Sequence, residues 1–125
     1  MPSLEMLGSF TLSPLKIDEV VTRKAPGNFA LGYVENKVFY MRYIGRADED
    51  INATLKSWVN YRPDCNRFKF SYAPNARAAF LKHCDIFHAF AQGSGLSTKD
   101  HPQRPEDSDW TCPHCDFFSQ PQPAS

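Results

Sequence analysis

The stretch GNFALGYVENKVFYMRYIGR, from Gly27 to Arg46, decides the fold of this chain. Two runs within it, Asn28 to Tyr33 and Val38 to Tyr43, are rich in aromatic and branched residues and are typical of β-strands. The polar residues Glu35, Asn36 and Lys37 between them fit a short hairpin connection. The stretch therefore predicts a β-hairpin that ends in Tyr43-Ile44-Gly45-Arg46.

Three further elements are predicted after the hairpin. A first helix follows from apolar residues at helical spacing, with Asp48 as its N-cap and its end near Asn60. The alternation of aromatic and polar residues from Arg67 to Tyr72 predicts a third, half-buried strand. A second helix is expected from Pro74-Asn75 to about Gln92, because its small and aromatic residues recur on one face.

This order of elements predicts a small α/β (α+β) domain with a three-stranded antiparallel sheet and flanking helices. Residues 1–22 are expected to form a lead-in that contributes a short turn or an edge strand. A single domain spans residues 23–118 and includes a C-terminal knuckle at residues 93–118. Residues 119–125 are rich in Pro, Gln and Ser and are predicted to be a flexible tail.

Composition narrows the class of protein. The chain has 125 residues, of which 42% are hydrophobic, and this favours one globular domain over a disordered chain. No apolar run approaches the roughly 18 residues that a membrane span needs, and the first residues lack a basic segment followed by an apolar one. A cytoplasmic protein without a membrane partner is the expectation.

The charge is balanced overall but uneven along the chain. Fourteen basic residues face fourteen acidic ones, so the total charge gives no case for nucleic acid. Residues 42–82, however, carry eight basic against four acidic side chains. This segment predicts either one basic face or ordinary solvated charges, and both interpretations stay open. The candidates for contact with nucleic acid are Arg42, Arg46, Lys56, Arg67 and Lys69.

Cysteine and histidine spacing points to a metal. Cys84 and His88 are four residues apart on the second predicted helix, so both side chains lie on one face and can reach one ion. Cys112 and Cys115 have the spacing with which two thiolates close on one tetrahedral metal. Three sulfurs and one imidazole are the ligand set of a structural zinc site. The sequence therefore predicts Zn²⁺ at these four residues.

Other interpretations of the same residues stay open. Cys84 could be a small buried apolar residue, His88 an ordinary helix histidine, and Cys112 with Cys115 a redox pair. His101 and His114 are reserve ligands that could replace His88. Four strong ligands leave no open position for water, which argues against catalysis at this zinc.

With this order of elements and the Tyr43-Ile44-Gly45 triplet, the chain resembles the GIY-YIG nuclease domain over about residues 26–92. Gly27-Asn28-Phe29 stands where the family has Gly-Ile-Tyr, and Tyr43-Ile44-Gly45-Arg46 matches the second half of the signature. The resemblance implies metal-assisted phosphodiester hydrolysis. In this chemistry a tyrosine helps to activate water, an arginine stabilises phosphate charge and a helix glutamate holds magnesium.

Transferred position by position, the resemblance also implies that much of this chemistry is missing. Phe29 stands at the first tyrosine position, Thr54 near the position of a helix arginine, and Trp58 at a position that is often His or Tyr. The glutamate position corresponds to Leu81 or His83, and the second predicted helix contains no glutamate. Without that carboxylate, magnesium loses its protein anchor.

Three functions are compatible with these features. The first is a catalytically inactive, zinc-binding GIY-YIG-like module that binds nucleic acid or a protein. The second is an active endonuclease that depends on Mg²⁺ or Mn²⁺ and uses Tyr43 and Arg46, with Tyr33 and His83 as further candidates. The third is a zinc-stabilised protein-interaction domain whose acidic tail, containing Trp110, is the working surface.

Overall fold

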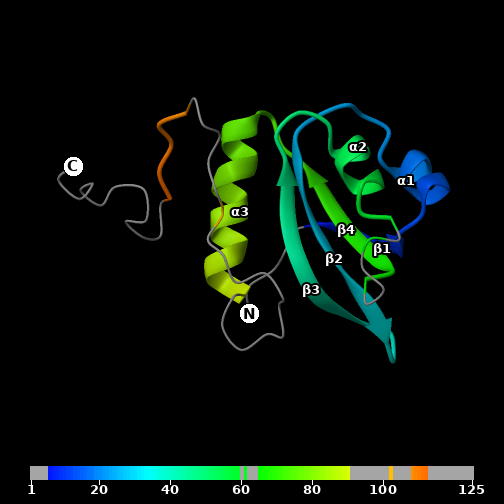
Figure 1. The fold of residues 1–125 in the computed structure, drawn as a ribbon. Helices are drawn as coiled ribbons and strands as arrows, with labels where there is room; N and C mark the ends of the chain where they lie inside the picture. Colours follow the sequence, from blue (N-terminus) through cyan, green and yellow to red (C-terminus); the bar gives the residue numbers. More distant parts are fainter. Residues whose placement is uncertain (1–5, 60, 62–64, 91–101, 103–107, 113–125) are drawn as a thin grey trace.

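The computed structural model describes residues 6–59, 61, 65–90, 102 and 108–112. Within these ranges the chain forms a mixed α/β fold with one four-stranded antiparallel sheet (Figure 1). The elements, in chain order, are β1 (Leu7–Thr11), α1 (Pro14–Val20), β2 (Gly27–Glu35), β3 (Val38–Ala47), α2 (Ile51–Lys56), β4 (Arg67–Tyr72) and α3 (Ala76–Phe90). The strand order is β1-β4-β2-β3, so β1 and β3 are the edges of the sheet.

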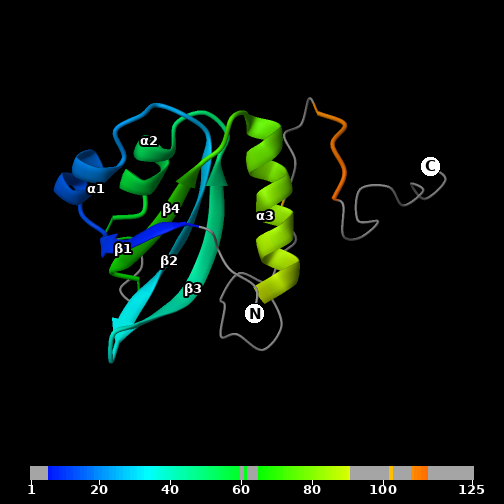
Figure 2. The same cartoon turned by 180° about the vertical axis from the view of Figure 1, so that it is seen from behind.

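Helices cover both faces of the sheet. Figure 1 and Figure 2 show α1 and α2 on one face and α3 on the other, alongside β3. The larger part of the core lies under α1 and α2, where Ile17, Leu55 and the inward Phe side chains of β2 and β4 are buried. A smaller part lies under α3, where Ile86 packs on Ala30 and Ile44.

The predicted hairpin is confirmed. β2 and β3 pair from Gly27 with Ala47 to Glu35 with Val38. Asn36 and Lys37 form the connection, and both have positive φ, 52° and 65°. Two consecutive residues with positive φ are typical of a two-residue hairpin turn whose twist matches that of the strands. Because Glu35 pairs with Val38 and so belongs to the strand, the turn is one residue shorter than predicted.

The sheet has four strands and not the three that were predicted. The lead-in supplies the additional edge strand, since β1 pairs with β4. It also supplies α1, which was not predicted, although Ser13 caps it through a hydrogen bond from the Lys16 backbone N–H and Pro14 opens it. Ile17 of α1 is fully buried, so residues 6–22 belong to the sheet and to the core.

The first predicted helix is shorter than expected and begins at a different cap. The N-cap of α2 is Asp50, whose carboxylate accepts from the backbone N–H groups of Asn52 and Ala53, and not Asp48. The prediction of Asp48 was wrong because this carboxylate binds Arg46. Regular helix ends at Lys56 rather than near Asn60.

The remaining predicted elements agree with the structure where it describes them. β4 has the predicted bounds, and its alternating burial places Phe68 and Phe70 in the core. α3 runs from Ala76 to Phe90, and the predicted end near Gln92 lies outside the described residues, as does the predicted tail at 119–125. A zinc-bound extension is not shown.

Candidate functional site

A cavity of about 270 Å³ opens at the end of edge strand β3. Its wall comes from four elements and the loop after β3. The lining residues are Phe29, Tyr43, Gly45, Arg46, Asp48, Thr54, Trp58 and His83. The cavity is therefore built from the two arms of the hairpin together with residues of or next to α2 and α3.

Gly45 allows the aromatic wall of this cavity to form. It lies directly opposite Phe29 in the β2–β3 ladder. A Cβ atom at position 45 would meet Cζ of the Phe29 ring at 2.5 Å, which is closer than atoms can approach. Because glycine has no side chain, the Phe29 ring can lie over its backbone and contact Tyr43 and Trp58, with ring centroids 6.4 and 6.3 Å away.

Arg46 is held in place from three sides. Its Nε donates to Asp48 Oδ1 at 2.8 Å, its Nη1 lies 3.1 Å from His83 Nδ1, and its Cζ lies 5.2 Å from the centre of the Phe80 ring. The Arg46 side chain is only 10% exposed. The ion pair with Asp48 therefore balances the guanidinium charge within the cavity wall.

The contact with Arg46 engages one nitrogen of the His83 ring. Arginine has only donors, so a hydrogen bond here requires Nδ1 of His83 to accept, as it does in the tautomer that carries its proton on Nε2. In that tautomer the accepting nitrogen is occupied by Arg46, which argues against His83 as a general base.

The cavity has a poor set of ligands for Mg²⁺, the metal that the GIY-YIG resemblance implies. Magnesium needs oxygen ligands, usually including a carboxylate. Among the described lining residues only Asp48 is a carboxylate, and its Oδ1 already accepts from Arg46. A divalent cation on Asp48 would lie beside the guanidinium charge. The described residues therefore do not fit a magnesium site.

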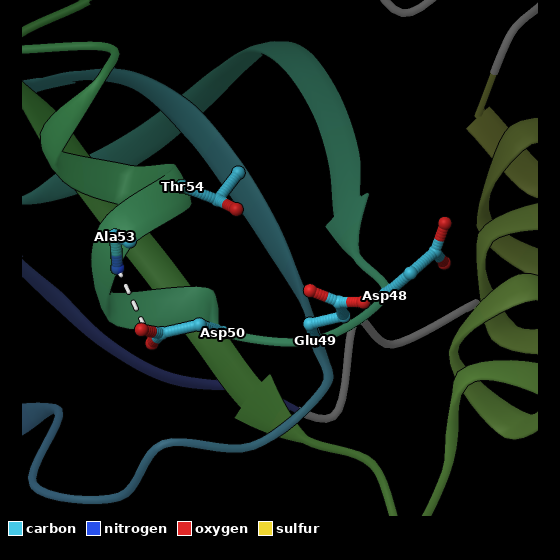
Figure 3. Close-up of a pocket in the computed structure, with 5 residues that line it drawn as sticks. All are labelled: Asp48, Glu49, Asp50, Ala53 and Thr54. Carbon is cyan, nitrogen blue, oxygen red and sulfur yellow. Dashed lines mark hydrogen bonds between the residues drawn. The ribbon is translucent and has the colours of Figure 1, made fainter.

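Two further carboxylates lie next to the cavity but line a separate hollow. Glu49 and Asp50 line it together with Asp48, Ala53 and Thr54 (Figure 3). The Asp50 carboxylate is occupied in capping α2, as the dashed line in Figure 3 shows. This side of the site is consequently acidic.

The positions that the resemblance singles out lie together. Phe29, Tyr43, Thr54 and Trp58 all line the cavity, and of the two candidates for the glutamate position His83 does so, whereas Leu81 packs in another cluster. Comparisons with protein families, with curated proteins and with solved structures give no match for the chain. Among the described residues, no helix has the length and apolarity to cross a bilayer.

Tyr33, a candidate for the active-nuclease hypothesis, does not line the cavity. It is near the turn of the hairpin, where its ring stacks on Tyr40 at 5.2 Å. It lies four positions along the strand from Phe29, a distance on the order of 13 Å. Of the four nuclease candidates, Tyr43, Arg46 and His83 are brought together and Tyr33 is not.

The predicted nucleic-acid contacts are distributed over the molecule. The strand register places Arg46, Arg67 and Lys69 on the sheet face that α3 packs against. Arg42 is the extra residue of a bulge in β3, between the partners of Leu31 and Gly32. Lys56 is on α2, where its Nζ forms an ion pair of 2.6 Å with Asp18.

Two of the four predicted zinc ligands meet on the outer side of α3. Cys84 and Cys112 are both buried in a cluster with Phe80, beside Trp110. Burial raises the pKa of Cys84 to about 12, and the hydrogen bond with the Cys112 thiol acts in the same direction. Trp110 packs against Phe80, with ring centroids 5.9 Å apart. The segment around Cys112 is thus fastened to α3 through thiols and an aromatic pair.

The other predicted ligands are placed only in part. His88 is exposed on α3, and its ring meets the ring of Phe87 edge-on at 5.3 Å. Cys115, His101 and His114 lie outside the described residues. Within the ranges that the structure describes, no three side chains of the metal-binding type come together.

Sequence reasoning missed two partners of Arg46. The ion pair with Asp48 could have been anticipated, because residues two apart in an extended segment point to the same side. The stacking of the guanidinium on Phe80 joins strand and helix across the sequence, and no local pattern indicates it.

Proposed function

We propose that this chain is a catalytically inactive GIY-YIG-like domain that binds nucleic acid and carries a structural zinc ion. The cavity provides the main support. It collects the positions that the family would use for catalysis, but its only described carboxylate is paired with Arg46. A nuclease of this kind needs a carboxylate that anchors its metal, and here the one described carboxylate of the cavity already accepts a hydrogen bond from Arg46.

The basic residues on the α3 side of the sheet support binding to nucleic acid. Arg67 and Lys69 lie on this face of β4, and Lys82 of α3 reaches the same strand through a 2.8 Å hydrogen bond to Ser71. The hydrogen bonds that Arg67 donates go to Ser9 and Thr11 of β1, which are uncharged acceptors. Two cations on β4 and a third that reaches this strand from α3 suit the phosphates of a nucleic acid backbone.

Binding can be tested by fluorescence anisotropy with labelled single-stranded and duplex DNA and RNA. Contacts with about three phosphates predict that the affinity for a duplex falls roughly 40-fold between about 50 and 200 mM salt. The double variant Lys69→Glu/Lys82→Glu should bind at least about tenfold more weakly at low salt. Lys16→Glu, on α1 at the opposite face, is the matched control and should bind as the parent does.

The absence of any salt-dependent binding at low ionic strength would rule out the nucleic-acid part of the proposal. Equal loss of binding in Lys16→Glu and in the double variant would show that the contact is not on this face.

The proposed zinc ion would be held by Cys84, Cys112, Cys115 and His88, with His101 or His114 as the alternative to His88. Support comes from the burial of Cys84 against Cys112, since two segments distant in sequence bring these thiols together. Zinc binds thiolate, so it would displace the protons of both groups and offset the cost of burying them. Mg²⁺ or Mn²⁺ has no place in this proposal, because neither fits the cavity.

A further inference from the structure

A strip of aromatic rings runs out of the cavity to the surface. Tyr43 and Trp58 have ring centroids 4.5 Å apart, and the rings of Trp58 and Tyr61 form a T-shaped pair with centroids 5.1 Å apart. Tyr61 is 71% exposed, and Tyr43 and Trp58 are half-buried. Trp58 also lines a second hollow, with Ser57 and Tyr61, so it separates two adjoining depressions.

The described residues that line the cavity and the acidic hollow beside it carry a net negative charge. Arg46 is the only Arg or Lys in the described lining of the cavity and of the acidic hollow beside it. Against this one cation stand Asp48, Glu49 and Asp50 (Figure 3). In these two linings one positive charge stands against three negative charges, and this balance disfavours phosphate and favours cations at the Tyr43 end of the strip.

We propose that Tyr43, Trp58 and Tyr61 form a binding site for an arginine side chain on a basic segment of a partner protein. A guanidinium plane can stack on an indole or phenol ring, and its N–H groups can reach carboxylates at the edge. Glu49 is exposed in the adjoining hollow, which shares Asp48 and Thr54 with the cavity. The ligand and the residues of this site differ from those of the proposed nucleic-acid surface. The two proposals can therefore be tested independently of each other.

The geometry favours a cation over an unpaired nucleotide base. Aromatic rings stack with bases as well as with guanidinium groups, but single-stranded nucleic acid brings a phosphate with every base. The carboxylates of the adjoining hollow oppose that phosphate, whereas they favour a guanidinium. The decisive comparison is thus between ligands of equal shape and different charge.

The test is calorimetric titration of the full chain with a synthetic octapeptide that contains four arginines among neutral polar residues. The matched probe replaces each arginine with citrulline, which keeps the planar shape and removes the charge. The arginine peptide should bind at least about tenfold more tightly. Equal binding of the two peptides would overturn the proposal.

Variants locate the site. Trp58→Leu and Glu49→Gln should each weaken binding of the arginine peptide by about threefold or more. Because Glu49 is exposed, Glu49→Gln should not affect folding. Tyr40→Leu is the control, because Tyr40 is an exposed aromatic residue near the turn of the hairpin. Unchanged binding in Glu49→Gln and Trp58→Leu, or an equal loss in Tyr40→Leu, would contradict the assignment.

The nucleic-acid surface serves as an internal reference. The double variant Lys69→Glu/Lys82→Glu should bind the arginine peptide as tightly as the parent does, although its affinity for nucleic acid is reduced. If a single-stranded oligonucleotide competes with the arginine peptide for Trp58, the strip is a base-stacking site and the proposal fails.

Discussion

Gly45 shows how one residue determines the shape of the candidate site. Its missing side chain lets the Phe29 ring lie against the β3 backbone, and that ring in turn supports Tyr43 and Trp58. The same residue is the final glycine of the Tyr43-Ile44-Gly45 triplet. The triplet therefore has a packing role that is independent of any catalysis.

Replacing Gly45 with alanine should destabilise the fold. The new methyl group would overlap the Phe29 ring, and forcing extra volume into a packed site typically costs about 1–3 kcal/mol. Urea unfolding followed by circular dichroism measures this change. Adding Phe29→Leu should cost less in the Gly45→Ala background than in the parent, because the smaller side chain relieves the overlap. A Gly45→Ala protein as stable as the parent would show that the ring does not need this space.

At the residue scale, the sequence identified which residues line the site better than it identified how they interact. The resemblance marked Phe29, Tyr43, Thr54 and Trp58 correctly as neighbours in space, since all four line the cavity. It did not indicate that Asp48 pairs with Arg46, although their spacing of two residues was an available clue. The same pairing explains why the cap of α2 was misplaced. A carboxylate near a helix start serves as its cap only where no stronger partner competes for it.

At the scale of elements, prediction succeeded where one face is buried and the pattern is regular. β4 alternates strictly and was placed at its observed bounds, and the hairpin was found from its turn and strand composition. α1 has only seven residues and one fully buried side chain, Ile17, so periodicity gives little signal. Ser13 before Pro14 was the available clue, as a capping residue followed by proline in the first turn.

The contact between α1 and α2 predicts a specific dependence of stability on pH. Hydrogen bonds from Lys56, and to a smaller extent from Asn52, lower the pKa of the Asp18 carboxyl below its ordinary value. A carboxyl group with a lowered folded-state pKa stabilises the fold above its unfolded-state pKa, and this contribution is lost as the pH falls through the folded-state value. Asp18→Asn should therefore lower the urea midpoint slightly at pH 5–7.

The difference between Asp18→Asn and the parent should disappear as the pH is lowered below about 4. Glu35→Gln, an exposed carboxylate at the end of β2, is the control and should show no such difference. A constant difference across this pH range would show that the ionised Asp18 does not hold the two helices together.

On the scale of the whole molecule, α3 connects the cavity to the thiol cluster. Phe80 lies under the Arg46 guanidinium on one side and packs against Trp110 on the other. His83, which contacts Arg46, is followed directly by Cys84. A change in the thiol cluster should thus reach Arg46 through one turn of helix.

The proposed zinc ion predicts a defined metal content. Elemental analysis of the purified protein should find about one zinc per chain, and Cys112→Ser should remove it and lower the stability by several kcal/mol. Cys65→Ser is the matched control, because Cys65 is also buried but lies in the other core, under α1 and α2. His88→Ala distinguishes His88 from His101 and His114 as the fourth ligand. A fully stable protein without metal would refute the zinc site.

The central claim is that this domain binds nucleic acid without cutting it. The most direct measurement incubates one end-labelled strand, single and in a duplex, with the protein in Mg²⁺ or Mn²⁺ at low salt. Half of each sample is then run on a native gel and half on a denaturing gel. The claim predicts a shifted band on the native gel and a strand of full length on the denaturing gel. Shortened strands that disappear with Tyr43→Phe and Arg46→Ala, or a native band that does not shift, would contradict it.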